Sequence, residues 1–147
     1  MKKPIIFGSS GFIGKHLSTS IQSDHLLADI IDNDKTIFCD VREPIDIEVK
    51  SIDLIFNLAA VHTTPGHDYY EYFETNVKGA ENICDFARKN NINNIVFVSS
   101  IAPYGTWEDE KFENSLLLPT SAYGMSKLYA EEIHKRWQSE DKKNRKL

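Results

Sequence analysis

The stretch Phe7-Gly8-Ser9-Ser10-Gly11-Phe12-Ile13-Gly14 lies between an apolar run, Pro4 to Phe7, and an amphipathic segment that begins at Phe12. This order predicts a strand, a turn and a helix. Its three glycines allow a tight turn, let the backbone approach a pyrophosphate and let the helix pack closely on the strand. The first helical turn offers N–H groups and the positive end of the helix dipole to phosphates. The stretch is therefore typical of a dinucleotide-binding turn, although an ordinary strand-to-helix loop can carry the same glycines.

The composition is that of a single globular domain. Of the 147 residues, 41% are hydrophobic and 27% are charged, which is enough apolar material for a packed core. The formal net charge of -5 does not suit a nucleic-acid surface, so we expect a small-molecule ligand. No apolar run approaches membrane-spanning length, and we expect no membrane contact and a cytoplasmic location. Cys39 and Cys84 match no metal or redox spacing and are interpreted as buried, reduced thiols, so no metal is expected.

A second strand is predicted from Leu26 to Asp32, after a first helix over Phe12 to Ser23. Asp32 lies 18 positions after Gly14, about where a Rossmann unit places the carboxylate that binds the adenosine ribose. Such a carboxylate would repel the extra phosphate of NADP and therefore favours NAD, while Lys35 is a counter-signal. A solvated turn is the alternative interpretation of Asp32.

The remaining strands are predicted from three apolar runs: 36–40, Asp53 to Ala60 and Ile95 to Ser100. The first follows the second strand too closely for an ordinary parallel crossover. It is either a short parallel strand reached by an extended link without a helix, or an antiparallel strand. The run that ends at Ala60 is typical of a central parallel strand buried on both faces, and its small terminal residues leave room for a ligand.

Helical spacing of apolar residues predicts a long helix over Tyr69 to Asn90 and another over Ala122 to Ser139,. Residues 101–121 are loop-like. The sequence therefore predicts an α/β fold with a doubly wound, mostly parallel sheet. It would form one Rossmann-type domain over residues 1–137, followed by a charged C-terminal tail over 138–147.

Tyr123 and Lys127 lie four positions apart and so share one face of the last predicted helix,. The ammonium group can approach the phenol, and a nearby positive charge favours the ionised phenol. Tyr123 is therefore a candidate general base. Ser100, at the end of a predicted strand, could bond the same substrate oxygen and stabilise charge there. Alone, a Y-x-x-x-K pattern is weak, because an aromatic residue beside a solvated lysine is common on helices.

Together these motifs resemble the NAD-dependent nucleotide-sugar epimerase/dehydratase family of extended short-chain dehydrogenases/reductases. The resemblance covers Lys3 to about Arg136, which corresponds to the N-terminal part of such proteins, before their later strands and substrate domain. It rests on these motifs in order: Gly8-x-x-Gly11-x-x-Gly14, Asp32, Asp40-Val41, Asn57-Leu58-Ala59-Ala60, Thr75-Asn76-Val77-Lys78-Gly79, Ser99-Ser100-Ile101-Ala102-Pro103-Tyr104-Gly105 and Tyr123-Gly124-Met125-Ser126-Lys127.

The resemblance implies a sheet order of 3-2-1-4-5, NAD as the cofactor and a catalytic set of Ser100, Tyr123 and Lys127, with Asn76 helping to hold the active site. His62 lies where several epimerases carry a lysine near the cofactor, and a solvent-facing loop histidine is the alternative. The residues expected to contact the cofactor are Gly8, Ser10, Gly11, Phe12, Ile13, Gly14, Asp32, Asp40, Val41, Leu58, Ala59, Ala60, His62, Tyr123 and Lys127.

The resemblance also implies a reaction in which the tyrosine removes a proton from a sugar hydroxyl while NAD accepts hydride from the same carbon. The substrate of the full-length parent would be a nucleotide sugar such as a UDP-sugar. The 4,6-dehydratases have a Thr-Asp-Glu run where this chain has Ser100-Ile101-Ala102, which favours an epimerase or a reductase. Because family members continue well beyond the last predicted helix, an inactive NAD-binding or interaction module is the alternative. We also expect a homodimer, formed through an unpaired strand edge at Ile95 to Val98.

Overall fold

The chain folds around one parallel β-sheet. The structure, a computed structural model, describes residues 3–31, 33–106 and 110–147. The sheet has the order β3-β2-β1-β4-β5, and every neighbouring pair is parallel. This confirms the predicted order of 3-2-1-4-5. The strands are β1 (Pro4–Phe7), β2 (Leu26–Asp29), β3 (Ile37–Phe38), β4 (Leu54–Asn57) and β5 (Ile95–Phe97).

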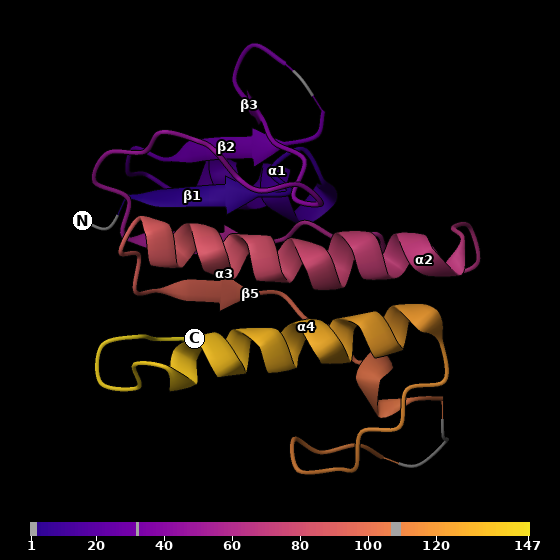
Figure 1. Cartoon of the computed structure of the whole chain (residues 1–147). Helices are drawn as coiled ribbons and strands as arrows, with labels where there is room; N and C mark the ends of the chain where they lie inside the picture. Colours follow the sequence, from indigo (N-terminus) through magenta and orange to yellow (C-terminus); the bar gives the residue numbers. More distant parts are fainter. Residues whose placement is uncertain (1–2, 32, 107–109) are drawn as a thin grey trace.

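Helices cover both faces of the sheet. In Figure 1, α1 (Phe12–Ser20) lies behind the sheet, whereas α3 (Gly79–Lys89) lies in front of it. The helix that ends with α3 begins as α2 (Tyr69–Tyr72) and passes through a π-helical stretch, η1 (Phe73–Lys78). A 3₁₀ turn, η2 (Ala102–Tyr104), precedes α4 (Ala122–Ser139), which runs beside β5. In Figure 1 the continuous helix α2–η1–α3 and the helix α4 both run antiparallel to the strands, so each begins near the carboxyl ends of the strands.

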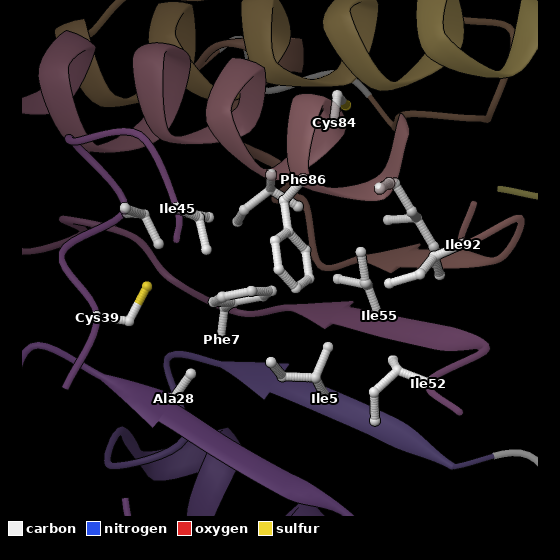
Figure 2. Packing of buried hydrophobic residues seen from close by; sticks show 14 of the residues in the cluster. Ile5, Phe7, Ala28, Cys39, Ile45, Ile52, Ile55, Cys84, Phe86 and Ile92 are labelled. Carbon is white, nitrogen blue, oxygen red and sulfur yellow. The ribbon is translucent and has the colours of Figure 1, made fainter. Parts of the chain in front are cut away.

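The core lies between the sheet and α3 (Figure 2). Ile5 and Phe7 of β1 and Ile55 of β4 are fully buried and point toward Phe86 of α3. The rings of Phe7 and Phe86 meet edge to face, with centroids 5.6 Å apart, which is a favourable aromatic geometry. From α4, Trp137 is also fully buried in this cluster. Burial of these side chains holds α3 and α4 against the sheet.

The connection from β2 to β3 resolves the alternative left by the sequence. β2 ends at Asp29, three residues before the predicted end, and β3 is parallel to it. Among its described residues, the link contains no helix. The strand stops early because Asn33 begins a turn: its side-chain oxygen accepts a hydrogen bond from Lys35 N at 3.1 Å, and its carbonyl accepts one from Thr36 N at 3.0 Å,. Asp32 itself lies outside the described residues.

The C-terminal segment pairs with the start of β5. Lys146 N donates to Asn93 O at 2.8 Å, and Ile95 N donates to Lys146 O at 3.0 Å. The expectation of an unpaired edge from Ile95 to Val98 is therefore wrong at Ile95, because the chain folds back over it after α4. Val96, one residue further on, is 42% exposed.

Candidate functional site

A cleft of about 670 Å³ opens beside the carboxyl ends of the strands. Its walls come from the glycine-rich turn, from the segments that follow β2, β3, β4 and β5, and from the first turns of α4. It brings together most of the residues that the sequence predicted to bind a cofactor. The predicted residues that line it are Gly8, Gly11, Phe12, Ile13, Gly14, Asp40, Val41, Leu58, Ala59, Ala60, His62, Tyr123 and Lys127.

Two glycines of the turn are required by close backbone contacts. Gly8 has a φ of +81°, and a Cβ added there would lie 2.6 Å from Ala59 N. A Cβ on Gly14 would lie 2.6 Å from Ser9 Cα. Side chains at either position would push the turn away from β4 or from α1. The N-cap of α1 is Gly11, which has no side chain to bond the first N–H groups of the helix. The turn thus fits a pyrophosphate, which needs backbone donors and close approach.

Asp29 is the acidic side chain that the structure places at the end of β2. It lines the cleft and is 9% exposed. Its Oδ2 accepts a hydrogen bond from Ser10 N at 2.9 Å, and its Oδ1 accepts one from Ile31 N at 3.0 Å. Sequence reasoning missed Asp29 because it assumed a strand that continued to the next acidic residue. The available signal was Asn33, which favours a turn soon after residue 29.

Asp40 occupies the adjacent wall, after β3. Arg42 donates to both of its carboxylate oxygens, through Nε at 2.9 and 3.0 Å and through Nη2 at 2.6 Å. These contacts hold the pKa of Asp40 below its ordinary value, so the carboxylate stays charged at neutral pH. Val41 is held in place by Asn82, whose Nδ2 donates to Val41 O at 2.8 Å.

Tyr123 and Lys127 line the opposite wall from α4. The helix is capped by Ser121, whose Oγ accepts a hydrogen bond from Gly124 N at 3.0 Å. Lys127 is 3% exposed, and its Nζ donates to Val98 O at 2.7 Å and lies 4.1 Å from the centre of the Phe97 ring. Burial lowers the pKa of Lys127 to about 8. The lysine is therefore still mostly protonated at neutral pH, as a partner of an ionised phenol must be.

The two serines after β5 have different surroundings. Ser100 Oγ accepts a hydrogen bond from Ala102 N at 3.1 Å and belongs to the turn that leads into η2. Among the described residues, Ser99 lines the cleft and Ser100 does not. The hydroxyl of Ser99 donates to Glu131 of α4. The sequence placed both serines at the strand end and gave a catalytic role only to Ser100. Which of two adjacent serines faces the cleft depends on the course of the backbone, which the sequence does not show.

Asn76 lies behind the cleft wall and is 3% exposed. Its Oδ1 accepts from Val61 N at 2.9 Å, and its Nδ2 donates to Val61 O at 3.0 Å and to Ser126 Oγ at 2.8 Å. Asn76 therefore joins the segment after β4 to α4. His62 is exposed at the cleft rim.

Two features are absent from the part of the chain that the structure describes: a metal-binding cluster and a helix that could span a membrane. No group of three or more His, Cys, Asp or Glu side chains there is arranged to hold a metal ion. Within the same residues, no helix has both the length and the apolar character needed to cross a membrane.

The chain is similar to known proteins both in sequence and in structure. The profile of the NAD dependent epimerase/dehydratase family matches residues 5–144. A relative from Escherichia coli O157:H7, N-acetyl-alpha-D-glucosaminyl-diphospho-ditrans,octacis-undecaprenol 4-epimerase, is 30% identical over 97% of this chain and 46% of its own. The solved structure of MoeE5 in complex with UDP-glucose and NAD matches with a TM-score of 0.82 and 25% identity, over 93% of this chain and 49% of the other. The chain thus spans about half the length of these relatives.

Proposed function

The chain belongs to the NAD-dependent epimerase/dehydratase family, and on that basis we propose that it is the NAD-binding part of a sugar epimerase or reductase. One observation carries the proposal: a single cleft is lined by the glycine-rich turn, by Asp29, the buried acidic residue at the end of β2, and by Tyr123 with Lys127. Dinucleotide-binding folds place their ligand at this edge of the sheet. Cys39 and Cys84 are free and buried, which supports a reducing, cytoplasmic setting.

Different residues of the cleft would bind different parts of the cofactor and substrate. Backbone N–H groups of the turn and of α1 would hold the pyrophosphate, and Asp29 rather than Asp32 would accept hydrogen bonds from the adenosine ribose hydroxyls. Asp40, kept charged by Arg42, would lie at the adenine end. When bound, NAD supplies the acceptor and donor of a hydride. Tyr123, which lines the same cleft as the buried Lys127 ammonium, would take the proton from a sugar hydroxyl,. Ser100, which does not line the cleft in this structure, would have to turn its hydroxyl toward the sugar to stabilise charge on the same oxygen,.

Cofactor binding tests this proposal directly. NADH is titrated into the chain and into Gly11→Val, whose side chain would occupy the space that the pyrophosphate needs. Thr19→Val, on the exposed side of α1, is the matched control because it adds the same residue type to the same helix. We expect NADH fluorescence to saturate with the wild type and with Thr19→Val, and affinity to be lost in Gly11→Val. Equal binding by all three would contradict the proposed site.

A nucleotide sugar such as a UDP-sugar is the proposed substrate class of the whole enzyme. Because the chain spans about half the length of the relatives it matches, we propose that these 147 residues alone bind NAD without turnover, since positioning of the sugar supplies much of such catalysis. Turnover of a UDP-sugar by the purified chain would contradict this.

A sugar diphosphate linked to a polyprenyl chain is the second candidate substrate. The Escherichia coli relative named above acts on such a lipid, and Ile101, Phe112 and Leu116 after β5 are more than half exposed. Thermal stabilisation of the NAD-loaded chain by UDP-N-acetylglucosamine would favour the first candidate. Stabilisation by the undecaprenyl-linked sugar in detergent, beyond detergent alone, would favour the second.

A further inference from the structure

We propose that Ser126 is a positioning residue for Tyr123. Its hydroxyl group joins η1 to the first turn of α4 and thereby fixes where the phenol stands in the cleft. The inference rests on the proposed role of Tyr123 as the general base, and it names a residue that the proton transfer itself does not use.

The hydroxyl of Ser126 is fully buried and has one partner on each side. Ser126 Oγ donates to Tyr123 O at 2.8 Å and accepts from Asn76 Nδ2 at 2.8 Å. The two bonds use the donor of the hydroxyl and one of its acceptor positions. A buried serine in a helix commonly bonds a carbonyl of the preceding turn. Here the carbonyl belongs to the residue that carries the phenol, and the second bond comes from another element.

The orientation of Asn76 is fixed by its own partners. Its oxygen accepts from Val61 N, and its two amide hydrogens are used by Val61 O and Ser126 Oγ. A flipped amide would place donors against Val61 N, so the contacts allow one orientation. Val61 follows Ala60 in the cofactor wall of the cleft. The chain of bonds therefore runs from that wall, through Asn76 and Ser126, to the backbone of Tyr123.

The π-helical stretch is what brings Asn76 to this point. Asn76 lies inside η1, between two ordinary helical segments, and is the buried residue of that stretch. π-helical turns occur mostly as local insertions within α-helices, frequently at functional sites. Here the altered winding directs one polar side chain toward α4 while α3 keeps its apolar face on the sheet. The local irregularity thus serves the link to Ser126.

The opposite side of the same turn of α4 rests on η2. A Cβ added to Gly124 would lie 2.7 Å from Ala102 O, so the helix backbone touches the backbone of that turn. Ala102 N in turn donates to Ser100 Oγ. Tyr123 is therefore held between a rigid backbone contact on one side and the Asn76–Ser126 bond on the other. Loss of the bond would free this turn of α4 from η1, so the position of Tyr123 in the cleft would no longer be fixed.

Ser139 supplies a matched control from the same helix. Its Oγ donates to Arg136 O at 2.7 Å, the same local bond that Ser126 makes to Tyr123 O. Ser139 is exposed, and the bond lies at the end of α4 away from the cleft. Replacing Ser139 by alanine therefore removes the local bond without touching the link to η1. A difference between the two alanine variants isolates the contribution of that link.

The test follows the Tyr123 ring by ¹⁹F NMR in the chain labelled with 3-fluorotyrosine. Tyr123→Phe identifies the resonance. We expect Ser126→Ala to shift or broaden the Tyr123 signal by more than its linewidth and to leave the signal of Tyr70 in place. Ser126→Thr, which keeps the hydroxyl, should restore the signal, and Ser139→Ala should leave it unchanged. A folded Ser126→Ala chain with an unaltered Tyr123 signal would overturn the proposal, even if its melting temperature were lower.

A second variant of Ser126 and a separate NADH titration complete the test. Should Ser126→Ala fail to fold, Ser126→Cys keeps nearly the same volume with a much weaker donor, and the same change in the Tyr123 signal is expected. The comparison is made without cofactor, so it decides on Ser126 alone. NADH is then added to the wild type: a chain that binds no NADH would contradict the proposed function while the result for Ser126 stands.

Discussion

Asp29 and Ser10 connect the end of β2 to the glycine-rich turn through a hydrogen bond of 2.9 Å from Ser10 N to Asp29 Oδ2. The other carboxylate oxygen of Asp29 accepts from Ile31 N at 3.0 Å. A carboxylate oxygen can accept more than one hydrogen bond, so both oxygens can also receive ribose hydroxyls. Asp29 thus contacts the glycine-rich turn and also lines the cleft. Mutation can therefore test whether Asp29 or Asp32 binds the ribose.

Asp29→Asn should weaken NADH binding by about 10-fold or more, because hydrogen bonds to a charged group contribute roughly 1.5–3 kcal/mol each. The amide keeps the size of the side chain but offers one acceptor oxygen instead of two. Calorimetric titration of NADH measures the change. Asp34→Asn, an exposed turn residue, is the control. A loss of affinity in Asp32→Asn, with none in Asp29→Asn, would return the assignment to Asp32.

Gly14→Ala and Gly11→Ala should differ sharply in stability. An alanine inside a helix usually stabilises it by about 0.5–1 kcal/mol relative to glycine. At Gly14 the added Cβ would lie 2.6 Å from Ser9 Cα, whereas at Gly11 it would meet Gly8 O at 3.3 Å. We expect Gly14→Ala to lower the free energy of unfolding by about 1–3 kcal/mol and Gly11→Ala to change it little. Urea denaturation measures both, and equal stabilities would contradict the close packing of the turn.

The pKa of Lys127, lowered by burial to about 8 from 10.5, predicts a pH dependence of stability. Between these two values the unfolded chain holds a proton that the folded chain has lost. The free energy of unfolding therefore rises with pH across this window, and the lysine destabilises the fold below it. Relative to Lys127→Met, the wild type should gain on the order of 2 kcal/mol between pH 7.5 and 10. Urea denaturation of both proteins at both pH values tests this. An equal change in the free energy of unfolding of the two proteins would contradict the lowered pKa of Lys127.

Burial also raises the pKa of Cys39 to about 11 and that of Cys84 to about 12. The unfolded thiols lose their protons first, so these groups reduce stability as pH rises above about 9. Both proteins in the Lys127 comparison carry the same cysteines. Only the difference between them is therefore assigned to the lysine.

Arg145 holds the C-terminal segment against α4 and the start of β5. Its Nη1 donates to Trp137 O at 2.7 Å, and its guanidinium carbon lies 5.0 Å from the Trp137 ring. Arg145→Met should lower the free energy of unfolding by about 1 kcal/mol. It should also increase self-association, because loosening this segment exposes the strand edge at Ile95.

Sedimentation equilibrium measures the association, and Lys143→Met, in the same segment, is the control. Unchanged association in Arg145→Met would show that this edge does not attract a second chain. The homodimer expected from the sequence stays a prediction, and an interface at this edge would have to use residues beyond Ile95.

The sequence predicted the order and type of most elements because most of its apolar runs are separated by clear polar or glycine-containing stretches. The bounds of β1 and α4 match the predicted ranges, since Pro4 and Phe7 delimit the first run and Ser121 caps the last helix. The predicted end of β2 was wrong because a turn that begins at Asn33 overrides an apolar run that continues past Asp29. The buried hydrogen bond between Ser126 and Asn76 could not be predicted, because the sequence of a helix does not show whether a small polar residue faces solvent or a distant asparagine.

The measurement that tests the central claim most directly is the parallel titration of the wild-type chain with NADH and NADPH. The account predicts saturable binding of one NADH per chain and at least about 10-fold weaker binding of NADPH, because the Asp29 carboxylate at the end of β2 would repel the additional phosphate. Absence of NADH binding would contradict the cofactor site. Equal or tighter binding of NADPH would contradict the role of Asp29 and shift attention to the nearby Lys35.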